Sequence, residues 1–283
     1  MTTIDKEGAA QNRRRAFVER TRNAPRLTSM LSSFESISQG LSQSPRGYPQ
    51  IERDYLNSRS EFVRHNEIFA RSVGTFFKHA ISSIPYRREN EMRVDVALNE
   101  FAKQYDRPLS LWGISSADGT RERTLSEYAN GNIVTLTDSP NFGNKHEFER
   151  LLTHDNSFFH HGCWVDINPD FLAKNPYSSH FKSGFDIIWE CCAFQMYDNN
   201  RKDQMEYIAE SLKPDGLVFL YEKMNAVNME DFIRMEELKT VFKMNYFEAE
   251  EILQKEKSIL GTMHNGCVTL DELVKDAKHI FKY

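Results

Sequence analysis

Apolar residues recur every three or four positions in the first third of the chain, and from residue 108 they cluster in short runs. The first pattern predicts helices over 51–84 and 89–105, which together form a helical cap over 49–107. The segment before the cap is rich in Arg, Ser, Gln and Asn, and its few apolar residues are scattered. We therefore expect residues 1–48 to form a mobile polar tail.

The short apolar runs after residue 108 alternate with helical segments. They predict strands over 109–114, 133–137, 158–167, 185–189 and 217–221, and helices over 121–129, 145–152 and 201–212. Strands that alternate with helices build a mostly parallel sheet covered by helices on both faces. We therefore expect a doubly wound α/β domain over 108–283, of which 221–283 is largely helical.

Composition and charge exclude several classes of protein. A hydrophobic fraction of 40% is too high for a disordered chain, and no apolar run is long enough for a membrane span or a secretory signal. A net charge of −5 argues against general binding to nucleic acid. The four cysteines form no C-x-x-C pair, so we expect no bound metal. We expect a cytoplasmic protein that binds neither membranes nor nucleic acid.

The turn after the first predicted strand carries the first chemical signal. Ligands of open parallel sheets bind beyond the carboxyl ends of the strands, so this turn, 113–120, and Asp138 after the second strand should contact one. A dinucleotide needs G-x-G-x-x-G there, because its pyrophosphate approaches bare backbone. This turn lacks that spacing and places Asp118 where a pyrophosphate would be repelled. S-adenosylmethionine, which carries an ammonium, a sulfonium and no phosphate, suits the turn better.

Four segments resemble the class I S-adenosylmethionine-dependent methyltransferases: LSLWGISSADGT, LTDSP, FDIIWECCAFQMY and LKPDGLVFLYEK. The resemblance covers residues 109–221, less than half of the chain. It implies a Rossmann-like fold, S-adenosyl-L-methionine as cofactor, and transfer of a methyl group (EC 2.1.1 type) to O or N of a small molecule of specialised metabolism. The transfer would be an in-line displacement in a pocket closed by a lid.

The resemblance also implies positions around the cofactor. These are Gly113, Ser115 and Ala117 against the methionine part, Asp138 at the ribose, Asp166 or Ile167 beside the adenine, and Glu190 and Cys191 near the transferred methyl group. The family usually has an acid two positions before the first glycine, where this chain has Leu111. The contact to the amino group then shifts to Asp118, to Glu190 or to water.

Each of these residues also has an ordinary structural interpretation. Asp138 fits a turn before Ser139-Pro140, Asp118 fits a helix N-cap, and Cys191 fits a small buried side chain. A general base is needed only if the acceptor is protonated. The candidates are Glu190, Glu222 and His264, with Tyr221 and Gln195 as polar groups that orient the acceptor. His264 fits a surface loop equally well.

The cap and the end of the chain leave further alternatives open. Aromatic residues of the cap suit either a lid over an apolar acceptor or plain core packing: Phe62, Phe69, Phe76, Phe77 and Tyr86. The family sheet has seven strands, but after Tyr221 only the segment 278–283 looks like the beginning of one. Three alternatives follow. The sheet is short, or a second copy or a partner subunit completes it, or the chain is a truncated relative of the family. The runner-up functions are an inactive methyltransferase-like assembly module and a nucleotide-dependent oxidoreductase.

Overall fold

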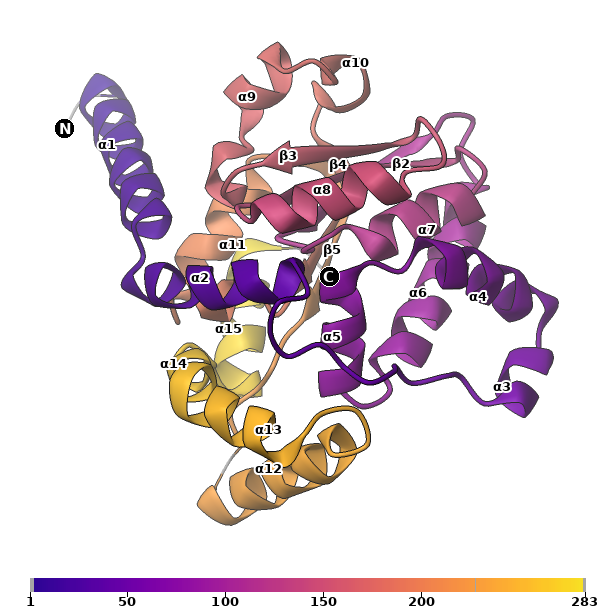
Figure 1. Cartoon of the computed structure of the whole chain (residues 1–283). Coiled ribbons are helices and arrows are strands. Elements are labelled where there is room, and N and C mark those ends of the chain that lie inside the picture. The colour runs from indigo at the N-terminus through magenta and orange to yellow at the C-terminus, as the bar shows by residue number, and fades with distance from the viewer. Residues whose placement is uncertain (1–2, 227, 282–283) are drawn as a thin grey trace.

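The computed structural model describes residues 3–226 and 228–281, and its centre is a five-stranded parallel sheet (Figure 1). The strands are β1 (Leu109–Ile114), β2 (Ile133–Ser139), β3 (Ser157–His161), β4 (Phe185–Cys191) and β5 (Leu212–Tyr221), in the order β3-β2-β1-β4-β5. Every neighbouring pair is parallel. The strand order reverses between β1 and β4, which confirms the predicted Rossmann-like, doubly wound fold and identifies the switch point where such sheets bind ligands.

Two apolar cores lie on opposite faces of this sheet. On one face, α6 (Arg87–Ala102) and α7 (Thr120–Tyr128) cover one core; on the other, α11 (Arg201–Ala209) and α15 (Leu270–Ile280) cover the larger one. Side chains alternate along β1, so that Leu111 joins the first core and its neighbour Trp112 the second. The sheet is therefore buried on both faces, as expected of a parallel sheet.

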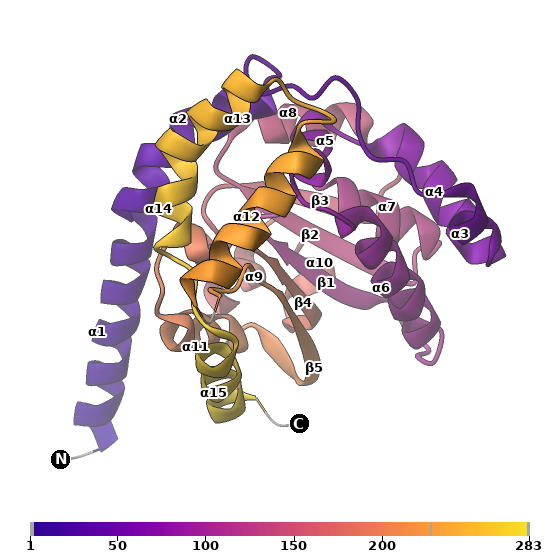
Figure 2. The same ribbon diagram turned by 90° about the horizontal axis from the view of Figure 1, so that it is seen from below.

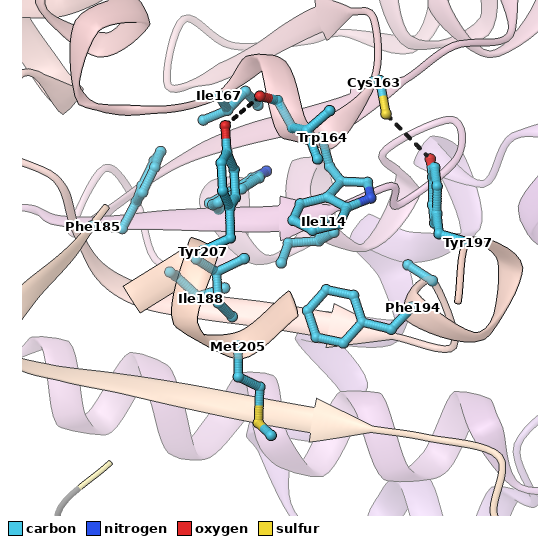
Figure 3. Close-up of a cluster of buried hydrophobic side chains, with 14 of the residues drawn as sticks. Ile114, Cys163, Trp164, Ile167, Phe185, Ile188, Phe194, Tyr197, Met205 and Tyr207 are labelled. Carbon is cyan, nitrogen blue, oxygen red and sulfur yellow. Dashed lines mark hydrogen bonds between the residues drawn. The ribbon is translucent and has the colours of Figure 1, made fainter. Parts of the chain in front are cut away.

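Aromatic rings fill the larger core (Figure 3). Trp164 lies edge-on to Tyr197 and Tyr207 with ring centroids 5.8 and 5.6 Å away, and Phe194 packs beside it. The hydroxyl of Tyr207 donates to the backbone carbonyl of Val165. This dense packing fixes the loops that follow β3 and β4 against each other.

Helices outside the sheet complete the fold. They are α1 (Thr3–Arg22), α2 (Pro25–Ser38), α3 (Arg53–Asn57), α4 (Ser60–Ser72), α5 (Thr75–Ser83), α8 (Phe142–Leu151), α9 (Pro169–Lys174), α10 (Ser178–Phe181), α12 (Met229–Lys243), α13 (Ala249–Lys255) and α14 (Gly261–His264). Figure 2 shows α12, α13 and α14 together on the same side of the molecule as α2. No helix within the described residues is both long and apolar enough to cross a membrane.

The expectation of a mobile tail is wrong for residues 3–38, which form α1 and α2. Met30, Phe34 and Ile37 recur at helical spacing on α2, and all three are buried. The carboxylate of Glu35 accepts hydrogen bonds from the backbone N–H groups of Phe142 and Gly143, both at 2.9 Å. A side chain of α2 thus caps the first turn of α8, which holds this segment on the domain.

Three predicted elements differ from the structure. The third strand ends at His161, since Trp164–Asp166 turns into a short 3-10 helix. The helical run over 51–84 is broken into α3, α4 and α5. The strand expected over 278–283 is wrong for residues 278–280, which finish α15, and residues 282–283 lie outside the described part of the chain.

Candidate functional site

A cavity of about 340 Å³ lies beyond the carboxyl ends of β1, β2 and β4, within the size range of small-molecule sites. Its floor consists of residues 115–117, 139–141, 191–192 and 195–197, which lie at the ends of these three strands or just after them. Its walls come from α2 and α5, and its roof from α12 and α13. A wider groove of about 580 Å³ runs along α6 and β5, but the loops after β1 and β2 do not reach it.

The floor loop after β1 has an unusual backbone conformation. Ser115 and Ala117 have φ angles of 46° and 52°, in the left-handed region that favours glycine. Both residues line the cavity. The resemblance assigned small residues to these two positions, and their backbone here is one that only short side chains tolerate at modest cost.

Asp138 lies directly beneath this loop and is fully buried. Its Oδ1 accepts hydrogen bonds from Trp112 Nε1 at 2.8 Å and from the backbone N–H of Ser115 at 3.1 Å, and its Oδ2 accepts from Ser115 Oγ at 3.1 Å. Burial raises the pKa of Asp138 to about 6. Asp138 is therefore the acid at the end of the second strand, where it is the penultimate residue of β2, but its oxygens hold the loop and do not line the cavity.

A second buried carboxylate lies under the same loop. Glu122, in the first turn of α7, points at Gly113: a Cβ on that glycine would lie 2.2 Å from Glu122 Oε1 and 2.7 Å from Ser116 Oγ. Burial raises the pKa of Glu122 to about 7. Leu111 leaves β1 without the family's acid, and Glu122 brings a carboxylate to the neighbouring position on the same face of the strand. Glu122 was not among the predicted site residues, because it lies in the helix after the turn and not in the turn itself.

Asp118 has a structural role, although the N-cap of α7 is Gly119 and not Asp118. Its Oδ1 accepts from the N–H of Thr120 at 3.1 Å, and its Oδ2 accepts from the N–H of Phe77 at 2.9 Å. A Cβ on Gly74 would lie 2.5 Å from this carboxylate, so a glycine there permits the approach. Asp118 thus joins α5 to the start of α7 and does not line the cavity.

Glu190 is also enclosed, whereas Glu222 reaches the cavity. Glu190 Oε1 accepts from the backbone N–H groups of Ala193 at 2.6 Å and Phe194 at 3.1 Å. Burial, and then repulsion from Glu222, raise the pKa of Glu190 well above its usual range. Glu222 itself forms a bidentate ion pair with Arg201, at 2.6 and 3.1 Å.

Of the two residues expected beside the adenine, Ile167 lies in the larger core and Asp166 is a partly exposed residue beside it. Ile167 is fully buried (Figure 3), and the carboxylate of Asp166 accepts from the N–H of Cys163 at 2.9 Å and pairs with Arg22. Neither lines the cavity, because the chain after β3 turns back into the core through a 3-10 helix. The cavity instead meets the β2–α8 segment at Ser139 and Asn141.

Of the remaining predicted residues, Cys191 and Tyr221 line the cavity and His264 does not. A hydrogen bond to Cys192, followed by burial, raises the pKa of the Cys191 thiol well above its usual range, so this residue is a neutral side chain. His264 packs against Phe232, with ring centroids 4.4 Å apart.

The aromatic residues of the cap fall into two groups. Phe76 and Phe77 line the cavity, as a lid requires. Phe62 and Phe69 are buried among the helices of the cap, and Tyr86 is 74% exposed. The part of the cap that lines the cavity is therefore α5, together with Ile84 and with Arg87 at the start of α6.

The roof contains the residues that the sequence analysis missed most completely. Lys239 and Lys243 of α12 and Lys255 of α13 line the cavity opposite the floor, together with Lys223 after β5. The spacing of the first two puts them on one face of α12. The helical spacing of apolar and basic residues over α12 can be recognised in the sequence. Which face of α12 lines the cavity depends on how this helix packs, and the sequence does not give that.

Comparisons with known proteins give weak likenesses only. No family model matches the chain, and no curated protein matches it by sequence. The cyclopropane synthase MmaA2 from Mycobacterium tuberculosis is 13% identical, with a TM-score of 0.42 over 65% of this chain and 59% of that one. A SAM-dependent methyltransferase from Geobacter sulfurreducens, solved with S-adenosyl-L-homocysteine, is 15% identical, with a TM-score of 0.41 over 66% of this chain and 62% of that one.

The plantazolicin methyltransferase BpumL, solved with SAH and a monoazolic desmethylPZN analog, is 14% identical, with a TM-score of 0.48 over 78% of this chain and 79% of that one. The chain thus spans less than two thirds of the length of the first two similar structures. Likenesses of this size do not decide a function, which depends on the geometry of the cavity itself.

Proposed function

We propose that this chain is an S-adenosylmethionine-dependent methyltransferase that transfers a methyl group to O or N of a small-molecule acceptor. The observation that carries the proposal is the floor of the cavity. A loop of small residues, 115–117, lies at the switch point of the sheet and covers two buried carboxylates, Asp138 and Glu122. Such a floor disfavours a pyrophosphate and favours a ligand that carries positive charge, because a nearby cation stabilises the ionised carboxylates.

One unpaired polar atom in the cavity wall also fits this cofactor. Asn144 is buried and lines the cavity; its Nδ2 donates to Ser139 Oγ at 2.9 Å, whereas its Oδ1 has no hydrogen-bond partner among the described residues. A buried acceptor without a donor costs about 1–3 kcal/mol. A ribose hydroxyl or an adenine amino group would supply the missing donor, so we assign the adenosine part to this side of the floor.

The other residues of the floor would hold the amino-acid part. Ser115 and Ala117 would lie against it, with Cys191 beside the reacting end. Asp138 acts through Ser115, since both of its oxygens already hold that residue and Trp112. The bound cofactor would supply a methyl carbon activated by a sulfonium.

The chain's own residues then have to align the acceptor and exclude water. Tyr221 lines the cavity and offers a polar group for this purpose, with Phe76 as an apolar wall. Gln195, the other predicted orienting residue, is bound at both ends of its amide, by the carbonyl of Cys192 and the thiol of Cys267. Of the candidate bases, Glu190 and His264 lie outside the cavity wall, and both carboxylate oxygens of Glu222 are held by Arg201. We therefore propose orientation by Tyr221, without a carboxylate base, as the contribution of the chain.

Calorimetric titration with S-adenosylhomocysteine tests the proposal. The unaltered chain should bind it, and Asp138→Ala should weaken binding at least tenfold because Ser115 loses the carboxylate that holds it. Asp155→Ala, which removes an exposed carboxylate at the opposite end of the sheet, is the matched control and should leave the affinity unchanged. Binding of NAD in place of S-adenosylhomocysteine, or of neither, by the folded chain would contradict the proposal.

A further inference from the structure

The charges in the cavity wall are unbalanced. Five basic side chains line it, and only two acidic ones, Glu222 and Glu236, do so. The basic side chains are Arg87, Lys223, Lys239, Lys243 and Lys255. Since the chain as a whole has a net charge of −5, this local excess of positive charge does not reflect the composition. It belongs to the cavity.

Ion pairs account for part of this excess. Glu222 is held by Arg201 from outside the cavity wall, and Arg87 Nε donates to Glu91 Oε1 at 2.8 Å. Glu236 pairs with both Lys223, at 3.2 Å, and Lys239. These pairs leave the two lysines that lie furthest along the roof, Lys243 and Lys255.

Within the described residues, neither of these lysines has a carboxylate at ion-pair distance. Lys255 Nζ contacts His79 Nε2, and His79 Nδ1 lies 2.9 Å from the backbone carbonyl of Gln43. Burial, and then the charge of Lys255, lower the pKa of His79 well below its usual range, so the imidazole is neutral. With Nδ1–H donating to the Gln43 carbonyl, Nε2 is left as a neutral acceptor. Lys255 therefore has a hydrogen-bond partner but no counter-charge.

Lys243 is only 6% exposed, which makes its lack of a counter-ion costly. Burial lowers the pKa of both lysines. For Lys243, attraction to the more distant Glu236 and Glu256 offsets part of this effect, whereas for Lys255, whose pKa falls to about 7, repulsion from Lys243 is the next cause. The two ammonium groups thus face the same space and repel each other. A single anion between them would offset both the desolvation and the repulsion.

We propose that the methyl acceptor is an anion, a small carboxylate or phosphate compound whose charged group is bound by Lys243 and Lys255. The identification of this ligand as the methyl acceptor rests on the proposed function. The anion site itself is argued from the lysines alone. The apolar part of the acceptor would lie against Phe34, Phe76 and Met263, which line the same cavity. The cofactor's own carboxylate would stay on the floor, near Ser115.

Calorimetric titrations with benzoate, phenyl phosphate and the uncharged benzamide, in the presence of S-adenosylhomocysteine, test this inference. At least one of the two anions should bind in the millimolar range or tighter, and benzamide should bind at least tenfold more weakly. Comparison of benzoate with phenyl phosphate separates a carboxylate acceptor from a phosphate one. Equal binding of benzamide and both anions, or no anion binding by the folded chain, would overturn the proposal.

Variants locate the anion. Lys243→Met and Lys255→Met should each weaken anion binding at least tenfold and leave the affinity for S-adenosylhomocysteine unchanged. Lys257→Met, which removes an exposed lysine two residues further along the chain, is the matched control and should change neither. Unchanged anion binding in both roof variants would overturn the assignment, and so would loss of S-adenosylhomocysteine binding, since the lysines would then hold the cofactor.

The same titrations separate this inference from the proposed function. Anion binding that depends on Lys243 and Lys255, in a chain that does not bind S-adenosylhomocysteine, would support the anion site and contradict the methyltransferase. Binding of S-adenosylhomocysteine without binding of an anion would support the methyltransferase and contradict the anion site.

Discussion

The floor and the roof of the cavity bury charges of opposite sign. Beneath the floor, Asp138 and Glu122 are carboxylates whose pKa values burial raises to about 6 and about 7. In the roof, Lys243 and Lys255 are ammonium groups whose pKa values burial lowers. One physical cause, loss of water around a charged group, thus raises the pKa of the carboxylates beneath the floor and lowers the pKa of the lysines in the roof. The floor is suited to a cationic cofactor and the roof to an anionic acceptor.

The two regions also differ in how they are held. The floor is made of strand ends whose backbone is fixed by the sheet and by the packing of Trp164 and Phe194. The roof is made of helices whose outer surfaces expose several large apolar side chains, among them Leu238 and Val241. The floor is therefore the more rigid part of the site, and we expect ligand-dependent movement to be confined to the roof.

The largest expected effect concerns the buried ion pair between Arg201 and Glu222, beside the cavity. Arg201 binds Glu222 with two hydrogen bonds and donates to the carbonyl of Gly266 at 2.9 Å, and both charged side chains are fully buried. Arg201→Ala leaves a buried carboxylate without its partner, so the free energy of unfolding should fall by about 3–5 kcal/mol. Denaturant titration measures this loss.

The neighbouring Lys202→Ala is the control, since it removes an exposed lysine 3.8 Å from Glu206 and should cost less than about 0.5 kcal/mol. Part of the stability lost in Arg201→Ala should return when Glu222 is also replaced, by Gln. A loss below about 1 kcal/mol in Arg201→Ala would show that the carboxylate of Glu222 does not depend on this partner.

The next effect is a pH dependence of opposite sign in the two regions. The folded-state pKa of Asp138, about 6, lies above its ordinary value of 3.8, so the folded chain binds more protons than the unfolded chain between these values. Stability should therefore fall as the pH rises from about 4 to 6, by roughly 3 kcal/mol from this group. Asp138→Asn, which stays neutral, should remove that part of the slope in a series of unfolding curves.

Lys255 should act in the other direction. Its folded-state pKa of about 7 lies below its ordinary value of 10.5, so the unfolded chain binds more protons between these values. Stability should therefore rise as the pH increases from about 7 to 10.5, and Lys255→Met should remove this rise. For each variant, the free energy of unfolding is compared with that of the unaltered chain across the pH range. If Asp138→Asn and Lys255→Met changed the slope of this free energy with pH in the same direction, the comparison between floor and roof would be contradicted.

The smallest expected effect concerns backbone strain in the floor, at the left-handed residue Ala117. Ala117 has a φ of 52°, where an L-residue pays a conformational cost that glycine avoids. Ala117→Gly should therefore leave the chain as stable as before or more stable by up to about 1 kcal/mol, measured by thermal unfolding. Ala129→Gly, at a φ of −75°, is the control and should destabilise the chain. Equal losses in both variants would show that the loop carries no strain.

The sheet could be predicted from the sequence because parallel strands are buried on both faces and form continuous apolar runs, as in β1 and β4. The helix α2 could not be predicted from composition, although Met30, Phe34 and Ile37 have helical spacing. The end of β3 was misplaced because Trp164 and Val165 are as apolar as a strand but lie in a turn.

The site could be predicted best at the ends of strands. The resemblance assigned Ser115, Ala117 and Cys191 to positions at or just after a strand end, and all three line the cavity. Asn144 and Lys243 were not predicted, because whether they line the cavity depends on which face of their helix is turned toward it. A sequence pattern gives the faces of a helix but not the surroundings of each face.

The most direct test of the account is whether the two ligands bind together. The anion that binds more tightly, benzoate or phenyl phosphate, would be titrated calorimetrically into the free chain and into the chain saturated with S-adenosylmethionine. The account predicts that saturation leaves the anion affinity unchanged or increases it, because a cation on the floor attracts an anion under the roof. Competition between the two ligands would contradict it, since floor and roof would then be one site.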